Sequence, residues 1–341
     1  MSMSDTQAAP EALDPLTLLA IKHGTDKWGP HFYTPVYHSL FAHLREKPVR
    51  LLEVGVGGFH LSTVGGESLS MWAEYFPSGR IVGIDLAEKR LDLDPRIRLY
   101  QGSEEDVPFL LRVVHECGPF DIIIDDGSHI PQHVVKTFTT LFPAMPDGGL
   151  YVIEDIQTTF WTSHGGSTVD GGDTMRLARN ILEHINHTEI AVVQPSRSVN
   201  PWMKSIRSFR AFHNLFVVEK GDNTEPSSFA YSVDNAHAAR AVRTIENQMA
   251  KSPTAPGYAN LADIYRRADD LERAAAIADD ALARWPDNTK LLSIAALIAS
   301  DHGDLTLKIE YLRRLLAREP DNAAIRSQLQ IAQSEAAAAV P

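Results

Sequence analysis

Two short acidic clusters, each directly after an apolar, strand-like run, constrain the fold of this chain more than any other feature. Residues 120–124 lead into the first cluster, residues 150–153 lead into the second, and a helix-sized segment separates them. This order predicts a strand–helix–strand unit whose parallel strands end at the same edge of one sheet. Ligands of such sheets bind beyond the carboxyl ends of the strands. We therefore expect three carboxylates and an imidazole at one site: Asp126, His129, Glu154 and Asp155.

The chemistry of such a cluster favours a hard metal ion. Neighbouring carboxylates repel one another, and burying them without a partner is unfavourable. A divalent cation removes this conflict, and Mg²⁺ takes oxygen ligands while keeping positions open for substrate or water. Thiolate-rich metal sites are disfavoured because the chain has a single cysteine, Cys117. The residues alone therefore predict a hard-metal site with a base beside it.

The strand pattern predicts the fold class. Residues 50–55, 81–85 and 97–101 form three further apolar runs, and helical segments alternate with all five runs. This alternation predicts an α/β fold with a doubly wound, mostly parallel, Rossmann-like sheet. Residues 205–212 and 215–219 predict a hairpin that closes the sheet.

The C-terminal third of the chain has a different character. After about residue 230 the sequence becomes rich in alanine and helical in pattern, and Pro-Asp-Asn occurs at 286–288 and again at 320–322. That spacing matches the roughly 34-residue period of tetratricopeptide repeats. We predict α-helical, tetratricopeptide-like repeats over residues 231–335. Three uses stay open for them: binding another protein, pairing two copies of the chain as a homo-oligomer, or holding a long acceptor.

Composition argues against several classes of partner and against a membrane or secreted location. The formal net charge of −12 disfavours a nucleic-acid backbone as partner. No run of eighteen apolar residues occurs, so we expect no membrane span. The first residues lack a basic region followed by an apolar core, which argues against a secretory signal. A single cysteine favours a reducing compartment, so we predict a cytoplasmic protein.

A glycine-rich turn follows the first strand. Residues 53–58 read Glu-Val-Gly-Val-Gly-Gly, and glycines let a backbone turn tightly and approach a ligand closely. A dinucleotide-binding fold is the alternative, although His60 and Leu61 leave the G-x-G-x-x-G pattern incomplete. Asp85 ends the next strand, where it either accepts the ribose hydroxyls of a nucleotide or caps a loop. Ser103, after the third strand, either contacts adenine or caps a helix.

Four segments together carry a family resemblance: residues 22–27, 53–57, 124–129 and 153–155. They resemble the metal-dependent sugar O-methyltransferases of macrolide biosynthesis, of the mycinamicin and tylosin type. These are class I S-adenosylmethionine-dependent methyltransferases, and the resemblance covers about residues 15–220. It implies a methyltransferase domain, which we place at residues 15–230, after a disordered N-terminus at residues 1–14.

The resemblance also implies roles for named residues. It implies that Mg²⁺ is bound by Asp126, Glu154 and Asp155, and that His129 is the general base. S-adenosyl-L-methionine binding is assigned to seven residues: Glu53, Gly55, Gly57, Asp85, Gly102, Ser103 and Asp125.

The chemistry of methyl transfer fits these roles. A neutral sugar hydroxyl is a poor nucleophile, and a cation that chelates two neighbouring hydroxyls lowers their pKa and orients them. A histidine near one ligand can take the proton near neutral pH. We therefore predict a Mg²⁺-dependent O-methyltransferase acting on a sugar or glycosylated small molecule. The alternatives are an enzyme for catechols or other diols, and a non-catalytic binding protein that uses the repeats as a scaffold.

Segments around the predicted site have less specific patterns. Lys27 and Tyr33 lie in a polar loop that either contacts cofactor or substrate or packs at the edge of the domain. We predict that residues 59–66 are an insertion over the site and that the glycine-rich residues 163–173 act as a lid over bound sugar. Phe160-Trp161 either flanks a sugar ring or belongs to the core. Three other histidines are predicted to lie on the surface or in the core: His133, His164 and His213.

Overall fold

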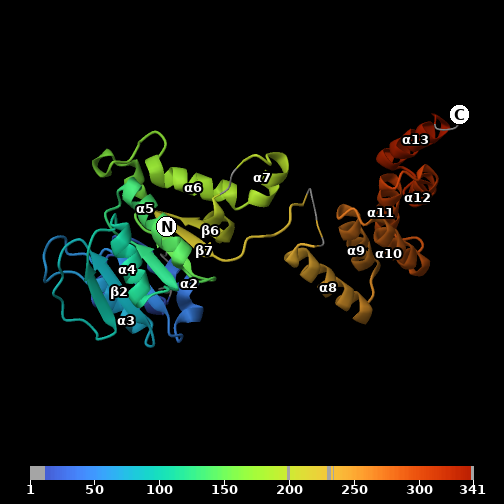
Figure 1. Cartoon of the computed structure of the whole chain (residues 1–341). Helices are drawn as coiled ribbons and strands as arrows, with labels where there is room; N and C mark the ends of the chain where they lie inside the picture. The colour runs from blue at the N-terminus through green and yellow to red at the C-terminus, as the bar shows by residue number, and fades with distance from the viewer. Residues whose placement is uncertain (1–11, 198–199, 229–231, 233, 339–341) are drawn as a thin grey trace, which may run out of the picture. The chain divides into compact units, whose positions relative to one another are not determined.

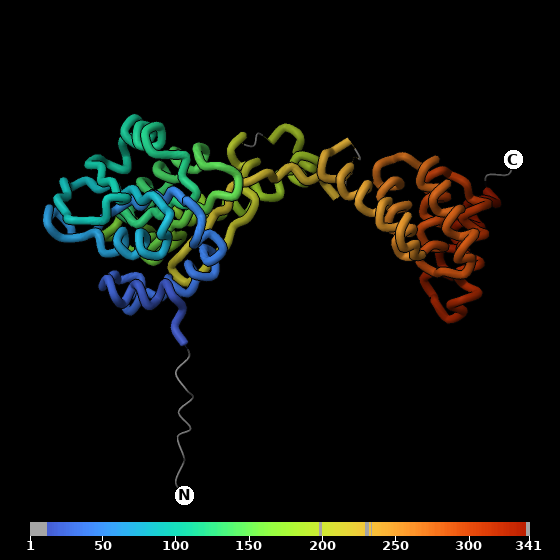
Figure 2. Tube along the Cα trace, turned by 90° about the horizontal axis from the view of Figure 1, so that it is seen from below, coloured from blue at the N-terminus to red at the C-terminus, as the bar shows by residue number. Residues whose placement is uncertain are grey.

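The computed structural model describes residues 12–197, 200–228, 232 and 234–338. It divides into two compact units. The first comprises Met1–His187 and Ser198–Asn223, and the second comprises Thr188–Arg197 and Thr224–Pro341. Figure 1 shows that the strands belong to the first unit, and Figures 1 and 2 show that the C-terminal part of the chain is helical.

The first unit is built on a seven-stranded sheet with the order β3-β2-β1-β4-β5-β7-β6. Strands β1 to β5 pair in parallel, and β7 and β6 add an antiparallel hairpin next to β5. The predicted fold class, a doubly wound and mostly parallel Rossmann-like sheet, is confirmed. The strand bounds are β1 (Arg50–Val54), β2 (Arg80–Asp85), β3 (Ile97–Gln101), β4 (Ile122–Asp125), β5 (Leu150–Ile153), β6 (Ile206–Phe212) and β7 (Leu215–Lys220).

Helices cover both faces of this sheet (Figure 1). Successive side chains of a strand point to opposite faces, so Leu51 packs with α1, α2 and α3 while Leu52 packs with α4, α5 and α6. Central strands buried on both faces read as continuous apolar runs, which is why the sequence reveals them. The helix bounds are α1 (Pro15–His23), α2 (Thr34–Phe41), α3 (Glu67–Tyr75), α4 (Val107–Cys117), α5 (Pro131–Leu141) and α6 (Gly172–His184). The next helix, α7 (His187–Val193), belongs to the second unit from Thr188 on.

The N-terminus of the first helix differs from the expectation of disorder through residue 14. Asp14 caps α1, because its Oδ1 accepts hydrogen bonds from the backbone N–H groups of Leu16 (3.0 Å) and Thr17 (2.9 Å). Residues 1–11 lie outside the described residues.

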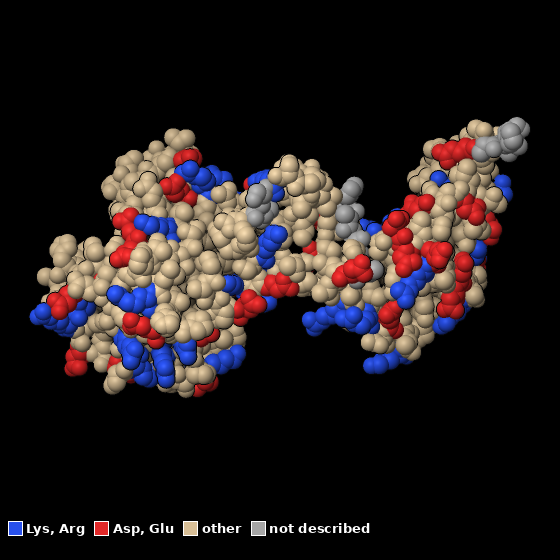
Figure 3. All heavy atoms as spheres, in the orientation of Figure 1, with Lys and Arg blue, Asp and Glu red and all other residues tan. Residues whose placement is uncertain are grey.

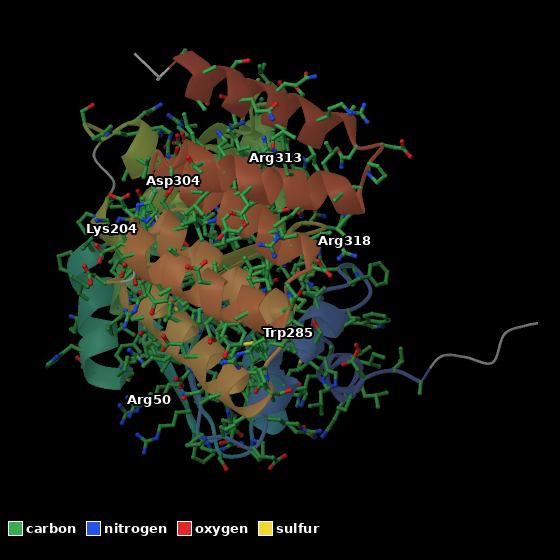
Figure 4. The ribbon with its side chains drawn as sticks, turned by 90° about the vertical axis from the view of Figure 1, so that its right-hand side faces the viewer. Arg50, Lys204, Trp285, Asp304, Arg313 and Arg318 are labelled. Carbon is green, nitrogen blue, oxygen red and sulfur yellow. The ribbon has the colours of Figure 1, made fainter. Side chains whose placement is uncertain are left out.

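The second unit is a succession of antiparallel helices with a core rich in alanine and leucine. Pro-Asp-Asn follows both α10 and α12, so the repeated sequence marks equivalent turns. Trp285, labelled in Figure 4, follows α10, and its ring centre lies 5.9 Å from that of Tyr258 on α9. The remaining helix bounds are α8 (Ala236–Lys251), α9 (Ala255–Arg267), α10 (Leu271–Arg284), α11 (Thr289–Asp301), α12 (Leu305–Arg318) and α13 (Ala323–Ala338).

Two surface properties bear on partners. In the described part of the chain, no helix combines the length and the apolar character needed to cross a membrane. On the face drawn in Figure 3, acidic and basic side chains occur on each unit, so neither unit presents one charge sign there.

Candidate active site

Three neighbouring strands end at the predicted site. Val54 of β1 pairs with Asp125 of β4, and Asp125 pairs with Ile153 of β5, so the segments that follow leave the sheet side by side. The backbone N–H of Asp126 donates to the carbonyl of Val54 at 2.9 Å, and that of Glu154 donates to Asp125 at 3.0 Å. Both acidic clusters therefore meet at one edge of the sheet.

Lys27 lies among three carboxylates at this edge. Its Nζ is 2.7 Å from Glu154 Oε1, 2.8 Å from Asp126 Oδ2 and 3.1 Å from Glu53 Oε1. The side chains of Lys27 and Glu53 are 1% and 0% exposed, so water does not screen these ion pairs. Burial alone would lower the pKa of Lys27, but the carboxylates raise it well above its usual value. Lys27 is therefore a permanent ammonium inside the site.

Glu154 and Asp126 each keep one oxygen outside these ion pairs. Tyr37 donates to the same Oε1 of Glu154 at 2.5 Å, and within the described residues no hydrogen bond reaches Glu154 Oε2. Asp126 Oδ1 lies 3.9 Å from Nε2 of His129. Burial, followed by the charge of Asp126, raises the pKa of Glu154 well above its usual value. A cation that reached the two remaining oxygens would relieve this repulsion.

Asp155 is also held by neighbouring side chains through one of its carboxylate oxygens. Its Oδ1 accepts a hydrogen bond from the Tyr33 hydroxyl at 2.7 Å and lies 3.5 Å from Nδ1 of His31. Its Oδ2 lies 3.7 Å from Nε2 of His129. Burial favours the protonated form, but the Tyr33 hydrogen bond and the charges of His129 and His31 outweigh it and lower the pKa of Asp155. Asp155 is therefore ionised, and its Oδ2 lies on the side of His129.

Two sets of three potential ligands share Asp126. In the first set, one atom each of Asp126, His129 and Asp155 lie within 4.8 Å of one another. In the second, one oxygen each of Glu53, Asp126 and Glu154 do so, and Lys27 already lies among them. The structure thus places His129 and the three predicted ligands together, with the Lys27 ammonium on one side of Asp126 and the His129 imidazole on the other.

Two of these residues have left-handed backbones. His129 has φ 57° and Asp155 has φ 52°, a region that residues with side chains adopt rarely and mainly where the surroundings enforce it. The Thr158 hydroxyl lies 2.7 Å from the carbonyl oxygen of Asp155 and 3.2 Å from that of His129. Thr158 therefore ties the two turns together, and each strained turn aims a functional side chain at the same space.

The glycine-rich turn after β1 packs against the metal-side loop. Gly55 has φ 91°, and a Cβ built on it would lie 2.1 Å from the carbonyl oxygen of Asp126. Only glycine fits there, because the approach is to backbone that has no room to move. Gly57 has φ 76°, so it also adopts the left-handed region that the turn requires.

The other predicted cofactor residues line the ends of neighbouring strands. Asp85 accepts backbone hydrogen bonds from Val56 at 3.1 Å and Ala87 at 2.8 Å, so it caps its loop and also supports the glycine turn. Gly102 packs on the ring of Phe109. Asp125 is buried and accepts a hydrogen bond from the Tyr151 hydroxyl at 2.8 Å. Glu53 differs from these residues because its side chain contacts Lys27 and Ser68.

The chain is similar to sugar O-methyltransferases of known pathways. It is 44% identical over 212 residues to the 8-demethyl-8-(2-methoxy-alpha-L-rhamnosyl)-tetracenomycin-C 3'-O-methyltransferase of Streptomyces olivaceus, which covers 61% of this chain and 54% of that protein. It is 41% identical over 214 residues to the mycinamicin VI 2''-O-methyltransferase of Micromonospora griseorubida, covering 62% and 53%. The chain thus spans about half the length of the curated relatives it matches. No family model matches it.

A solved structure supports the same relationship. MycE, a methyltransferase from the mycinamycin biosynthetic pathway solved in complex with Mg and SAH, has a TM-score of 0.61 at 38% identity, covering 67% of this chain and 59% of that one. A MycE complex with Mg, SAH and mycinamycin VI has a TM-score of 0.56. The predicted resemblance to the sugar O-methyltransferases is confirmed. After the relatives that it matches, we call the first unit the methyltransferase unit below.

Three residues of the methyltransferase unit have surroundings that the sequence left open. Lys27 is buried among carboxylates, where it is shielded from a substrate, and Tyr33 binds Asp155. Ser103 is not a helix cap, because α4 begins at Val107 and Asp106 accepts its capping hydrogen bond. A lysine in a polar loop is expected to be exposed, so the sequence did not indicate that Lys27 is buried.

His133 also has partners that the sequence did not suggest. Its Nδ1 lies 2.9 Å from Ser128 Oγ and 3.3 Å from Glu104 Oε1, and its Nε2 lies 3.2 Å from Glu105 Oε2. Glu104 also accepts from the backbone N–H of Ser128 at 3.2 Å. These contacts join the loop after β3 to the loop after β4 in the methyltransferase unit.

The predicted lid and its aromatic pair lie after β5. A short 3-10 helix (Thr162–His164) runs into residues 163–173, and the backbone N–H of Ser167 donates to the carbonyl of Thr159 at 2.9 Å. Phe160 and Trp161 are 44% and 49% exposed, so neither is a core residue. His164 is partly buried and His213 is exposed. A covering role for this segment stays a prediction.

Proposed function

We propose that the methyltransferase unit moves a methyl group from S-adenosylmethionine to a hydroxyl of a sugar or glycosylated small molecule, with Mg²⁺ as cofactor. The observation that carries the proposal is the arrangement of three carboxylates at one sheet edge, each with one oxygen already held. Lys27 and Tyr37 hold Asp126 and Glu154, and Tyr33 holds Asp155. The choice of a sugar as the acceptor rests on the names of the relatives.

The donor set fits magnesium. Asp126, Glu154 and Asp155 would hold the ion through oxygens, the ligand type that Mg²⁺ prefers. Lys27, Tyr37 and Tyr33 fix those carboxylates from behind, as outer partners do in metal sites generally. When bound, the ion lowers the pKa of two neighbouring acceptor hydroxyls and orients them. The Mg and SAH in the MycE structure support this cofactor pair.

The base assigned to this reaction is His129. Its Nε2 lies 3.7 Å from Asp155 Oδ2 and 3.9 Å from Asp126 Oδ1, beside the oxygens that remain for the ion. From there it takes the proton of the acceptor hydroxyl as oxygen attacks the sulfonium methyl. The left-handed turn that Thr158 supports keeps the imidazole at that position.

The methyl donor would lie on the glycine turn. Gly55 and Gly57 let the backbone approach it closely, and Asp85 and Asp125 end the adjacent strands. Gly102 and Ser103 follow β3, at the position from which an adenine would be contacted. The acceptor would then be a small molecule at the same sheet edge.

One assay tests the proposal. The purified chain is incubated with S-adenosylmethionine, Mg²⁺ and a panel of alkyl and aryl rhamnosides plus a catechol, and products are measured by mass spectrometry. We expect a methylated rhamnoside that disappears with EDTA and returns with excess Mg²⁺. Methyl transfer that survives chelation would overturn the metal mechanism. Turnover of the catechol alone would favour the other diol class, and SAH binding without any turnover would favour a binding protein.

Replacement of His129 by alanine should lower kcat by roughly 10²–10⁴-fold, the range that a positioned proton acceptor contributes. Titration calorimetry should find SAH affinity unchanged, because the residue contributes to proton transfer. His115→Ala, on the exposed side of α4, is the matched control and should keep full activity. An unchanged kcat in the His129 variant would remove this residue from the role of base.

A further inference from the structure

The loop after the glycine turn is folded around the ammonium of one lysine. Lys89 Nζ lies within hydrogen-bond distance of four backbone carbonyl oxygens, those of Gly57 (2.5 Å), Phe59 (2.8 Å), Leu61 (3.1 Å) and Val64 (3.2 Å), so its three N–H groups are shared among them. Lys89 belongs to the segment after β2 and is partly buried. No other lysine in the described part of the chain donates to so many backbone carbonyls.

The loop is closed at its base and has little room to change shape. The backbone N–H of Gly66 donates to the carbonyl of Val56 at 2.8 Å. A Cβ on Gly58 would lie 2.0 Å from the carbonyl oxygen of Val64, and one on Gly65 would lie 2.6 Å from that of Val56. The two sides of the loop are therefore in backbone contact, and the Lys89 ammonium occupies its centre.

The four carbonyls need that ammonium. Carbonyl oxygens that converge on one point carry partial negative charge and repel one another unless a cation or other donors satisfy them. Without Lys89, the loop would lose the cation that gathers these oxygens, and in this exposed loop they would turn apart toward water. Gly57 would move with it, because its carbonyl receives the shortest of the four hydrogen bonds.

The loop is also tied to the segment that carries Asp85. The backbone N–H of Arg90 donates to the carbonyl of Ser62 at 2.7 Å, and Asp85 accepts from the backbone N–H of Val56 at 3.1 Å. The loop after β1 and the loop after β2 therefore behave as one assembly, with Lys89 at the junction. Both edges of the candidate methyl-donor site depend on it.

We propose that Lys89 is a positioning residue for the methyl donor: its ammonium sets the shape of residues 57–64 and so holds the glycine turn in the form that binds S-adenosylmethionine. The inference rests on the proposed function, because it requires that the turn binds this cofactor. Lys89 acts through the backbone, and none of the hydrogen bonds described for its ammonium reaches a predicted metal ligand. Its loss is therefore expected to weaken cofactor binding and leave the chemical step intact.

The test measures cofactor binding directly. Titration calorimetry with SAH compares the full chain with Lys89→Met, Lys89→Arg and the exposed-lysine control Lys47→Met. We expect Lys89→Met to raise the Kd for SAH roughly 10- to 100-fold, the effect of losing a charge-assisted hydrogen-bond set. Lys89→Arg should recover part of the affinity, and Lys47→Met should match the wild type. In steady state, Lys89→Met should raise KM for S-adenosylmethionine with kcat at saturation nearly unchanged.

Chemical rescue separates positioning from general stability. Lys89→Ala leaves space for a small amine, so propylammonium should restore SAH affinity, whereas tetramethylammonium, which cannot donate hydrogen bonds, should not. An unchanged Kd in Lys89→Met would overturn the proposal, as would a lower unfolding temperature with unchanged Kd. If the wild-type chain fails to bind SAH, the proposed function fails first and this inference with it. If wild type binds and the variants bind equally, this inference alone fails.

Discussion

Replacement of Asp126 by alanine is expected to lower Mg²⁺-dependent methyl transfer by at least about 10³-fold, or about 4 kcal/mol of transition-state stabilisation. Asp126 is the residue that both ligand sets share, and its two oxygens face different partners. Oδ2 binds Lys27 at 2.8 Å, and Oδ1 lies on the side of His129. The change therefore removes a predicted ligand and also breaks the link between the internal ammonium and the metal side.

The measurement pairs turnover with metal affinity. Activity is assayed over a range of Mg²⁺ concentrations, and Mg²⁺ binding is followed by calorimetry. Asp126→Asn keeps the shape of the side chain and should lose most of the activity too, which separates charge from packing. Asp147→Asn, in the exposed turn before β5, is the control and should behave like the wild type. An Asp126→Ala variant with normal turnover would contradict the ligand assignment.

Lys27→Met is expected to give the largest loss of stability of any single substitution considered, about 3–5 kcal/mol of unfolding free energy. The variant keeps the volume of the side chain but leaves Glu53 and Glu154 buried without their cation. Even with Lys27 in place, burial raises the pKa of Glu53 and of Glu154. Without it, these carboxyls must take up protons for the variant to fold.

The sign of the pH dependence follows from that proton uptake. The folded variant would bind more protons than the unfolded chain, so its stability should fall as pH rises from 6 to 8. Urea denaturation of the variant, of the wild type and of Lys47→Met, all in EDTA, measures this dependence. Equal unfolding free energies for all three proteins would show that the buried ammonium carries no stabilising role. A variant more stable at pH 8 than at pH 6 would contradict the electrostatic cause.

The strands and the acidic edge of the sheet could be predicted because their signals are local. The central parallel strands β1, β4 and β5 are buried and therefore form short apolar runs, and the residue after each run marks the edge where ligands bind. The hairpin of β6 and β7 was predictable from another local signal, because two strand-like runs flank the two-residue turn His213–Asn214. Asp126, Glu154 and Asp155 needed no knowledge of distant contacts.

The inner partners of the site could not be predicted because they come from far along the chain. Lys27 pairs with Glu154 across 127 positions, and Tyr33 pairs with Asp155 across 122. The loop that carries them has the polar composition of a surface loop. The four acceptors of Lys89 are backbone carbonyls. Every residue has one, so the sequence does not indicate which of them lie near Lys89. The left-handed backbones of His129 and Asp155 likewise run against the usual preference of these residues for negative φ.

The contact between Gly55 and the carbonyl of Asp126 has a thermodynamic consequence. The turn assigned to the methyl donor and the loop assigned to the metal meet backbone to backbone, so neither can shift without displacing the other. Two ligands that bind to such joined segments are linked: if one raises the affinity for the other by some factor, the second raises the affinity for the first by the same factor. Occupancy of the proposed donor site and of the proposed metal site would then rise together. An acceptor would therefore bind mainly to molecules in which both sites are filled.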